Sequence, residues 1–341
     1  MKNFGKILIL AAVALITLWG CSGTTEDLVV TLEADVVVIP ADGVSKVKFT
    51  VYEGNADVTA DAEIFDAATG TALGDAAFCT SAPGEYYFYA EYDSIRSGQV
   101  KIVAEEVVAS QFVRNVCLME FTDASCTFCP DASRYIDRNI LQKNPDVHLM
   151  AFHEKDQWKS PQFSTLASMF KLTATPYAVV NMKEGYSLET GARDKVKEAV
   201  TASSKKYSSH CAVAVSSSKD AQGNAAVEVK VYSEKSTDYS IAVYVVEDGL
   251  IGSQLDNGLE DKNYYHQFVT RKMVSQTVHG DHLGRIPASE EHSKTYNVVV
   301  DAEWNLAKTY VYALAMDAEG YVNNMQVCLL DGGYAGYEYK N

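Results

Sequence analysis

The 341-residue sequence has few of the features that mark proteins acting on nucleotides, nucleic acids or metal ions. It contains no cluster of Lys and Arg, no glycine-rich phosphate loop and no HExxH motif. Its formal net charge is -16 at pH 7, so its surface repels nucleic acid and anionic lipid. We therefore expect a protein that binds no nucleic acid and no nucleotide, and that uses no cofactor and no metal ion.

Long hydrophobic runs are also missing, and the one apolar run near the N-terminus is short. Lys2 and Lys6 precede residues 7–19, which are mostly apolar. The bilayer core requires about 20 residues, so this run is too short to span it, but it fits the hydrophobic part of a secretion signal. The run ends in Leu18-Trp19-Gly20-Cys21, which resembles the lipobox of bacterial lipoproteins.

The lipobox resemblance implies that residues 1–20 are a cleaved signal peptide and that Cys21 is acylated. A short polar tether, residues 21–27, would follow. The lipid on Cys21 would anchor the chain to a membrane of the cell envelope, and we expect the outer membrane, with its periplasmic or surface face left open. The alternative is an ordinary cleaved signal with an incidental cysteine.

Cysteine is scarce, with seven residues in the chain, and one pair has a spacing that indicates chemistry. Cys126 and Cys129 follow an apolar run, residues 113–121, and a short polar turn, which predicts a strand that runs into a helix. Cysteines three apart in a helical turn lie on one face, close enough to form a disulfide. The N-terminus of a helix also favours negative charge and lowers the pKa of a thiol there. The pattern therefore indicates a redox pair.

Two other interpretations of this pair are half a zinc site, with His148 or His153 as further ligands, and two unrelated core thiols. Zinc normally takes four ligands, and the sequence contains no second CxxC motif. Two further features favour redox chemistry. Glu120 stands at the end of the predicted strand, and Thr175-Pro176 directly precedes an apolar segment.

With these features, residues 112–206 resemble the thioredoxin superfamily. The order of the predicted elements, which is strand, helix, strand, helix, proline, hairpin and helix, is the order of that fold. The resemblance implies that Cys126 is the attacking thiol and Cys129 the resolving thiol. It also implies that Glu120 is the buried acid/base and that Pro176 is a cis proline against the disulfide. The two residues between the cysteines leave open whether the pair oxidises, reduces or isomerises.

Short alternating strands are predicted on both sides of this segment. We expect residues 28–108 to form an Ig-like β-sandwich, in which Tyr86 resembles the corner tyrosine of such domains. Residues 207–341 are expected to form a C-terminal β-sandwich. Cys211 and Cys328 lie on predicted strands of that last domain, and whether they form a disulfide is open.

A more specific resemblance comes from the order of three motifs. An EFT-x(3)-C-x(2)-CP signature, followed by an EDG...Q segment and a Y-x-H-x(2)-V-x-R segment, resembles a family of outer-membrane lipoproteins of Gram-negative bacteria. The last two segments are here Glu247-Asp248-Gly249 with Gln254, and Tyr264-Tyr265-His266 with Val269 and Arg271. We interpret the charged residues among them as a structural cluster, because no nucleophile accompanies them, and His279 and His282 as solvated loop residues.

The expected fold class is a multidomain α+β protein. It has an N-terminal Ig-like β-sandwich, a central thioredoxin-like α/β domain at 112–206 and a C-terminal β-sandwich. The expected function is thiol-disulfide exchange on exported client proteins that carry thiols or disulfides. The alternative is a non-enzymatic binding or assembly lipoprotein of the outer membrane that uses the thioredoxin fold as a platform.

Overall fold

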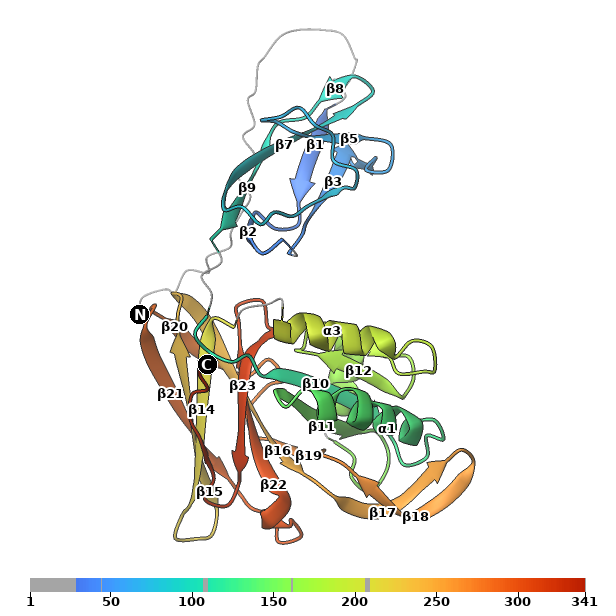
Figure 1. Cartoon of the computed structure of the whole chain (residues 1–341), viewed down its shortest axis with the longest axis vertical. Helices are drawn as coiled ribbons and strands as arrows, with labels where there is room; N and C mark the ends of the chain where they lie inside the picture. The colour runs from blue at the N-terminus through green and yellow to red at the C-terminus, as the bar shows by residue number, and fades with distance from the viewer. Residues whose placement is uncertain (1–28, 44, 107–109, 161, 206–208, 341) are drawn as a thin grey trace, which may run out of the picture. The chain divides into compact units, whose positions relative to one another are not determined.

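The computed structural model describes residues 29–43, 45–106, 110–160, 162–205 and 209–340. The chain divides into two compact units, one ending at Glu105 and one spanning Glu106–Asn341 (Figure 1). The expected signal peptide, the lipidation site at Cys21 and the tether lie outside the described residues. Among the helices of the described ranges, none combines the length and the apolar composition needed to cross a membrane.

The N-terminal unit is a sandwich of two β-sheets around one apolar core. Val47, Phe49 and Val51 point into this core and the residues between them are more exposed, as the period of two in the sequence predicts. The hydroxyl of Tyr86 donates a hydrogen bond of 2.8 Å to the carbonyl oxygen of Ala82. One sheet consists of β1 (Val30–Ala34), β3 (Val47–Glu53), β4 (Ala56–Asp57) and β6 (Ala77–Phe78). The other consists of β2 (Val38–Pro40), β9 (Val100–Glu105), β7 (Gly84–Tyr92), β5 (Glu63–Asp66) and β8 (Ile95–Arg96).

The second unit is built on a nine-stranded sheet (Figure 1). Its strands are, in order, β13 (Glu184–Ser187), β12 (Tyr177–Val180), β10 (Val116–Thr122), β11 (Val147–His153), β19 (Val269–Met273), β16 (Thr237–Glu247), β22 (Thr309–Met316) and β23 (Val322–Leu329), with β20 (Asp281–Ile286) paired to β16. β11 pairs in parallel with β19 through Ala151 and Val269, and the Ala151 N–H donates to the Phe268 carbonyl oxygen at 2.8 Å. This pairing joins the predicted α/β segment to the C-terminal strands.

A four-stranded sheet packs against one face of the larger sheet. Val213 and Val229 of the smaller sheet share a buried core with Val243 of β16 and Val311 of β22. The smaller sheet contains β21 (Glu290–Val298), β15 (Ala225–Ser233), β14 (Cys211–Lys219) and β24 (Tyr334–Ala335). A separate hairpin is formed by β17 (Leu250–Asp256) and β18 (Leu259–His266), and two short 3-10 helices are η1 (Leu141–Lys143) and η2 (Leu306–Lys308).

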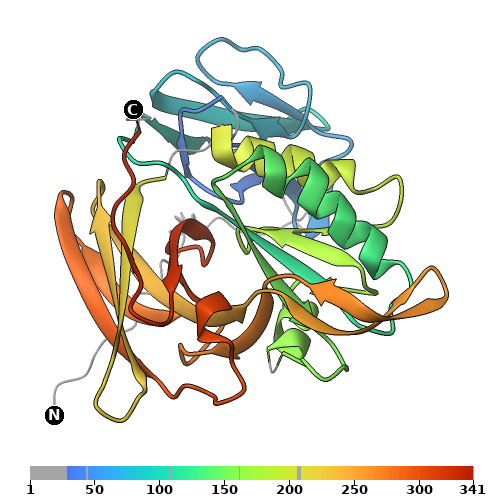
Figure 2. The same cartoon turned by 60° about the horizontal axis from the view of Figure 1, so that its bottom comes forward.

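β10 is buried at every position because other elements cover both of its faces. Val116 and Leu118 share a core with α1 and α3, whereas Met119 and Phe121 share a core with α2. The two views show α1 and α3 side by side on one face of the sheet (Figures 1 and 2). The helices are α1 (Cys129–Asn139), α2 (Phe163–Met169) and α3 (Asp194–Lys205).

The expected fold class, with a separate thioredoxin-like α/β domain at 112–206 in a multidomain α+β chain, is wrong. The described residues are mostly β-strand, and the strands of that segment belong to the sheet that also holds β16, β19, β22 and β23. They share a core as well, since Phe121 and Phe152 pack with Tyr244 of β16. Local sequence patterns identify single elements, but they do not tell which distant strands continue a sheet.

The large sheet bends until its last strand returns to the segment that precedes β10. The Asn115 N–H donates to the side-chain oxygen of Asn324 at 2.9 Å. The Val322 N–H donates to the Asn181 carbonyl oxygen, also at 2.9 Å. β10, β11 and α2 on one side and β16 and β22 on the other therefore enclose one core.

We expect a fragment of residues 110–205 not to fold by itself. It would expose Met119, Phe121 and Phe152, which pack against β16 and β22 in the whole unit. Burial of each such side chain contributes about 1.5–3 kcal/mol, and a typical domain is stable by only about 5–15 kcal/mol. Thermal unfolding followed by circular dichroism tests this, with residues 106–341 as the control that unfolds cooperatively. If the short fragment unfolds cooperatively, it folds as a domain by itself and this expectation is wrong.

Candidate functional site

The two motif cysteines lie where β10 leads into α1. The strand ends at Thr122, and α1 begins at Cys129, with Pro130 in the first turn, where a helix tolerates its missing N–H. A disulfide joins Cys126 and Cys129, whose Cα atoms are 5.4 Å apart. Cys126 is partly exposed, whereas Cys129 is only 1% exposed. Cys126 is therefore the more accessible residue of the pair, while Cys129 is shielded.

Glu120 lies on the face of β10 that α1 covers, and it is 2% exposed. Burial raises the pKa of Glu120 from 4.5 to about 7, because a desolvated carboxylate is unfavourable. A hydrogen bond from Ser133 and the charge of His153 act in the opposite direction and lower this pKa. Glu120 therefore exchanges its proton near neutral pH, where a general acid or base is most effective.

Ser133 connects Glu120 to the first turn of α1. Its hydroxyl oxygen lies 2.6 Å from Glu120 Oε1 and 3.1 Å from the carbonyl oxygen of Cys129. A hydroxyl has one proton to donate and two lone pairs to accept. When Glu120 is ionised, Ser133 donates to the carboxylate. When Glu120 is protonated, the carboxyl can donate to Ser133, and Ser133 then donates to Cys129, so the proton on Glu120 is coupled to the backbone at Cys129.

Pro176 lies at the end of the sheet where the cysteine loop begins. The Thr175–Pro176 peptide bond is cis, and Pro176 is buried. β12 starts at Tyr177 and pairs antiparallel with β10, with Tyr177 opposite Phe121. This register puts Pro176 beside the end of β10, from which the chain continues to Cys126. The fold thus brings Glu120, the cysteine pair and Pro176 to one end of the sheet.

The hairpin β17–β18 covers the cysteine loop, and sequence reasoning missed this contact. The Gln254 side-chain amide donates to the carbonyl oxygens of Asp123, at 3.2 Å, and Cys126, at 3.1 Å. The Leu255 N–H donates to the carbonyl oxygen of Ala124 at 2.8 Å. The signal in the sequence was the EDG...Q segment, whose glutamine is the residue that holds the loop.

Gly252 allows the hairpin to approach the segment after β11. A Cβ atom at this position would lie 2.4 Å from the ring of Trp158, closer than side chains can pack. Trp158 in turn packs against His266 at the end of β18, with 4.3 Å between the ring centres. The absence of a side chain at Gly252 therefore helps to seat the hairpin beside β11.

Two buried histidines lie near Glu120. His153 is 1% exposed, and its Nδ1 lies 2.5 Å from Asp156 Oδ2. Burial opposes ionisation of Asp156, but the hydrogen bonds from His153 and from backbone N–H groups outweigh it and lower its pKa. His266 is 4% exposed, and its ring centre lies 5.4 Å from that of His153. The sequence interpretation named both histidines but did not place them together.

The zinc interpretation of the motif finds no support in these contacts. His148 and His153 point to opposite faces of β11, because their positions differ by five, an odd offset along a strand. In the ranges that the structure describes, no group of three or more His, Cys, Asp and Glu residues is placed to hold a metal ion.

The charged residues of the second half form contacts between neighbouring strands. Arg271 Nη1 lies 3.2 Å from Glu247 Oε2. Asp248 accepts hydrogen bonds from the hydroxyl of Tyr265, at 2.9 Å, and from the N–H of Phe268, at 3.1 Å. The sequence interpretation grouped His266 with these residues, but its ring packs with those of His153 and Trp158.

The other described cysteines are free thiols. Cys211 and Cys328, whose pairing the sequence left open, are both buried and form no disulfide. Burial raises the pKa of Cys117, Cys211 and Cys328 to about 12, so these thiols are protonated and unreactive at neutral pH. Cys79 is exposed, and among the described residues of the N-terminal unit it has no second cysteine beside it.

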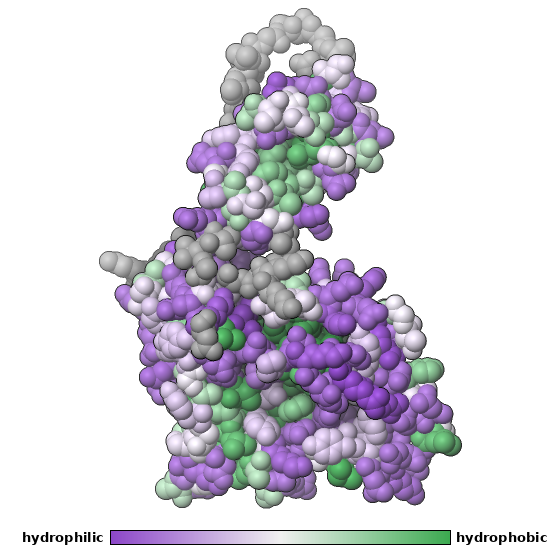
Figure 3. Space-filling model, in the orientation of Figure 1, coloured by the Kyte–Doolittle hydropathy of each residue, from purple (hydrophilic) through white to green (hydrophobic). Residues whose placement is uncertain are grey.

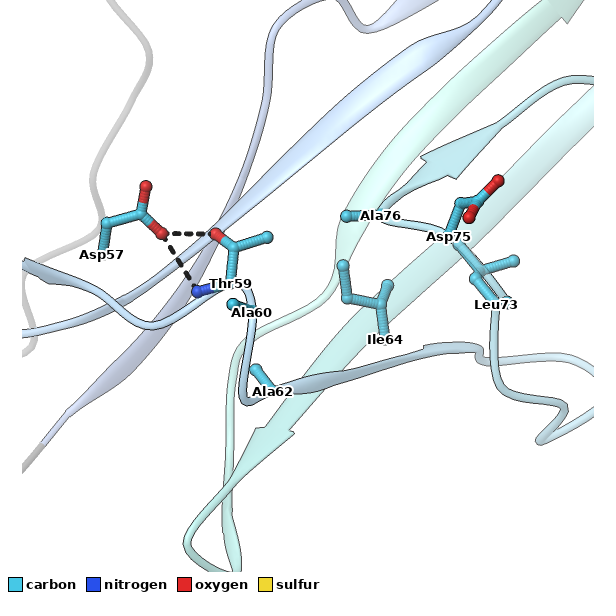
Figure 4. A pocket seen from close by; sticks show the side chains of 9 residues that line it. Asp57, Thr59, Ala60, Ala62, Ile64, Leu73, Asp75 and Ala76 are labelled. Atoms are coloured by element: carbon cyan, nitrogen blue, oxygen red, sulfur yellow. Dashed lines mark hydrogen bonds between the residues drawn. The ribbon is translucent and has the colours of Figure 1, made fainter.

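The N-terminal unit has an open hollow of about 740 Å³, but its lining offers little chemistry (Figure 4). Small or apolar side chains form most of its wall, and Asp57 accepts hydrogen bonds from the N–H and hydroxyl of Thr59. On the face drawn in Figure 3, hydrophilic side chains predominate over α1 and α3, and the apolar surface is broken up. The cysteine pair and its surroundings are therefore the candidate site.

Comparison with protein families gives one match in the second half of the chain. Residues 163–330, somewhat less than half of the sequence, match the family described as outer membrane protein Omp28. The match confirms the expected location in the cell envelope, at the outer membrane. It supports an outer-membrane protein family, which is the coarser part of the resemblance noted in the sequence. It begins after the cysteine motif and carries no information on Cys126, Cys129 or Glu120.

Comparison with solved structures gives a likeness of fold. HBP35 of Porphyromonas gingivalis is 19% identical and has a TM-score of 0.55, over 65% of this chain and 77% of that chain. At this identity the likeness shows a similar fold and says nothing of activity. The surface layer protein SbsC, domains 4-9, has a TM-score of 0.18, which is too low to support an argument. None of the curated proteins compared with the chain matches it.

We expect Glu120 to make the stability of the protein depend on pH. Its pKa is 4.5 when unfolded and about 7 when folded, so the folded state binds more protons between these values. The contribution of Glu120 to stability is then fully present below about pH 4.5 and is lost as the pH rises through about 7, a loss on the order of 3 kcal/mol in total.

Denaturant unfolding between pH 4 and 9 measures this loss. Glu120→Gln should remove most of it, because the amide does not ionise, whereas the exposed Glu198→Gln should keep it. If the unfolding free energy of Glu120→Gln falls with pH as much as that of the unchanged protein, the pKa of Glu120 is not raised in the folded state.

Proposed function

We propose that the protein carries out thiol-disulfide exchange on exported proteins in the cell envelope, through Cys126 and Cys129. The observation that carries this proposal is a disulfide with one accessible and one buried sulfur, next to a buried carboxyl group. Burial raises the pKa of that carboxyl, Glu120, to about 7. A lipid on Cys21 would hold the protein at the membrane where exported clients pass.

In the oxidising direction, a client thiolate attacks the sulfur of Cys126. The Cys126–Cys129 bond breaks, its electron pair leaves with Cys129, and the protonated Glu120 supplies the proton that neutralises this buried thiolate. A second thiolate of the client then attacks the client sulfur of the mixed disulfide. Cys126 leaves as a thiolate, and the client, which has lost two electrons, carries the new disulfide.

In the reducing direction, the same groups act in reverse order. The Cys126 thiolate attacks a client disulfide, and the ionised Glu120 removes the proton of Cys129, which then attacks Cys126 and releases the reduced client. The N-terminus of α1 favours negative charge on a sulfur near it, which makes Cys126 a good nucleophile and a good leaving group. The difference in exposure supports these roles, because Cys126 is partly exposed and Cys129 is buried.

A second candidate function is binding or assembly at the outer membrane without exchange. The observation that favours it is the extent of the Omp28 match, which leaves out the cysteine motif. The two functions differ in the thiol of Cys126. For exchange, we expect ultraviolet titration of the reduced protein to give a thiolate pKa well below the value of about 8.5 for a free cysteine. An ordinary value, with slow alkylation at neutral pH, would favour the binding function.

The exchange function predicts that Cys129→Ala traps clients. Without the resolving sulfur, Cys126 remains bound to the client as a mixed disulfide that a reducing agent releases. Non-reducing electrophoresis and mass spectrometry of the captured adducts measure this in cells that produce the variant.

Cys126→Ala is the matched control, because it keeps the buried thiol but lacks the accessible one and should trap nothing. Recovery of free Cys129→Ala protein alone, at the level of this control, would contradict the exchange function.

A further inference from the structure

A small cavity lies between Glu120 and the hairpin β17–β18. Its volume is about 20 Å³. A buried water molecule requires roughly 10–15 Å³ of such space, so the cavity has room for one. Its lining is mostly polar and comes from β10, α1, β11 and the hairpin. Its lining includes Glu120, Ser133, His153, Gln254, Tyr264 and His266.

His266 lines this cavity and has a buried ring nitrogen whose hydrogen-bonding capacity no described residue uses. Its Nε2 is buried and has no hydrogen-bond partner in the part of the chain that the structure describes. A hydrogen bond to the backbone of Ser253 uses the other ring nitrogen, which leaves Nε2 as the acceptor of a neutral ring. Burial lowers the pKa of His266 to about 4, so the ring is neutral at neutral pH. A buried acceptor is unfavourable unless a donor reaches it.

The described side chains around Glu120 have other hydrogen-bond partners, which favours a water molecule as the donor to His266 Nε2. The Ser133 hydroxyl is placed between Glu120 and Cys129, and His153 is held by Asp156. Burial and then the charge of Glu120 raise the pKa of Tyr264 to about 12, so this hydroxyl stays protonated, and its hydrogen-bond partner is Ser133 and not His266. The more distant charged groups are Arg134 and Asp256, which form an ion pair of 2.7 Å.

We propose that the cavity holds a water molecule that donates one hydrogen bond to His266 Nε2 and the other to the carboxylate of Glu120. His266 is then a positioning residue for the acid-base step, and this role rests on the exchange function proposed above. The acceptor at Nε2 fixes the orientation of the water, because one O–H points to the ring and leaves the other for Glu120. The water stabilises the ionised carboxylate, which burial alone would disfavour more strongly.

His266→Leu tests this role because it removes the acceptor and keeps an apolar side chain. Without the oriented water, the titration of Glu120 should shift upward by about one to two pH units, the usual effect of a hydrogen bond to a charged group. The readout is the unfolding free energy of the full chain against pH, with Glu120→Gln in the same background to isolate the contribution of Glu120. The pH profile of the exchange rate should shift by the same amount.

Two further variants separate positioning from packing. His266→Gln keeps an acceptor oxygen and should largely restore the original titration of Glu120. His279→Leu makes the same change at an exposed position and should leave that titration unaltered. A folded His266→Leu protein in which Glu120 titrates as before overturns the proposal.

The unchanged protein provides a test that does not depend on folding of the variants. A crystal structure of the full chain should show a water molecule within hydrogen-bond distance of both His266 Nε2 and Glu120. A dry cavity, or another group in it, overturns the proposal. If the water is present and His266→Leu shifts the titration, but the protein exchanges no disulfides, then the exchange function fails and the water site stands.

Discussion

The pairing of β11 with β19 is the contact on which the candidate site depends. In the described residues these strands pair at Ala151 and Val269, and the Ala151 N–H donates to the Phe268 carbonyl oxygen. β11 ends at His153, and the chain reaches β19 directly after β18 ends at His266. The pairing therefore brings the two histidines together and seats the hairpin over the cysteine loop. The same contact that makes one sheet out of two predicted domains also completes the surroundings of Glu120.

The burial of β10 explains why these surroundings are polar. A strand that is covered on both faces places every side chain in a region of low dielectric, where an unpaired carboxylate is strongly disfavoured. Glu120 can still ionise in this strand, because a hydrogen bond from Ser133 and the charge of His153 favour the carboxylate. These two residues come from different elements. Buried titratable groups with displaced pKa values are typical of sites that exchange protons.

The parts of the site that sequence could predict are those that depend on short stretches of chain. A disulfide between Cys126 and Cys129 follows from their spacing of three residues, although the bond closes the turn before α1, in which the Cys129 N–H donates to the Cys126 carbonyl oxygen, and not a turn of the helix itself. The position of Glu120 in a strand just before the motif follows from the local apolar pattern. Resemblance, rather than spacing, suggested a cis bond before Pro176, and the bond is cis.

The parts that sequence could not predict depend on pairing between distant strands. The EDG...Q segment singles out Gln254, but it does not indicate that this hairpin lies against the cysteine loop, because strand alternation specifies a face and not a partner. The same limit caused the error in fold class. The apolar residues of β10 and β11 were expected to be covered within a domain of their own, whereas β16 and β22 cover one of their faces.

The burial of Cys129 sets the direction in which pH would act on the proposed exchange. A thiolate in the interior is strongly disfavoured, as the raised pKa values of the buried Cys117 and Cys211 illustrate. Opening the disulfide at Cys126 is therefore easiest when Glu120 still holds its proton, at pH values below about 7. Attack by Cys129 requires the opposite state, an ionised Glu120 that can accept a proton. Protonated Glu120 would thus assist the step in which a client thiolate opens the disulfide, and ionised Glu120 would assist the attack of Cys129 on the mixed disulfide.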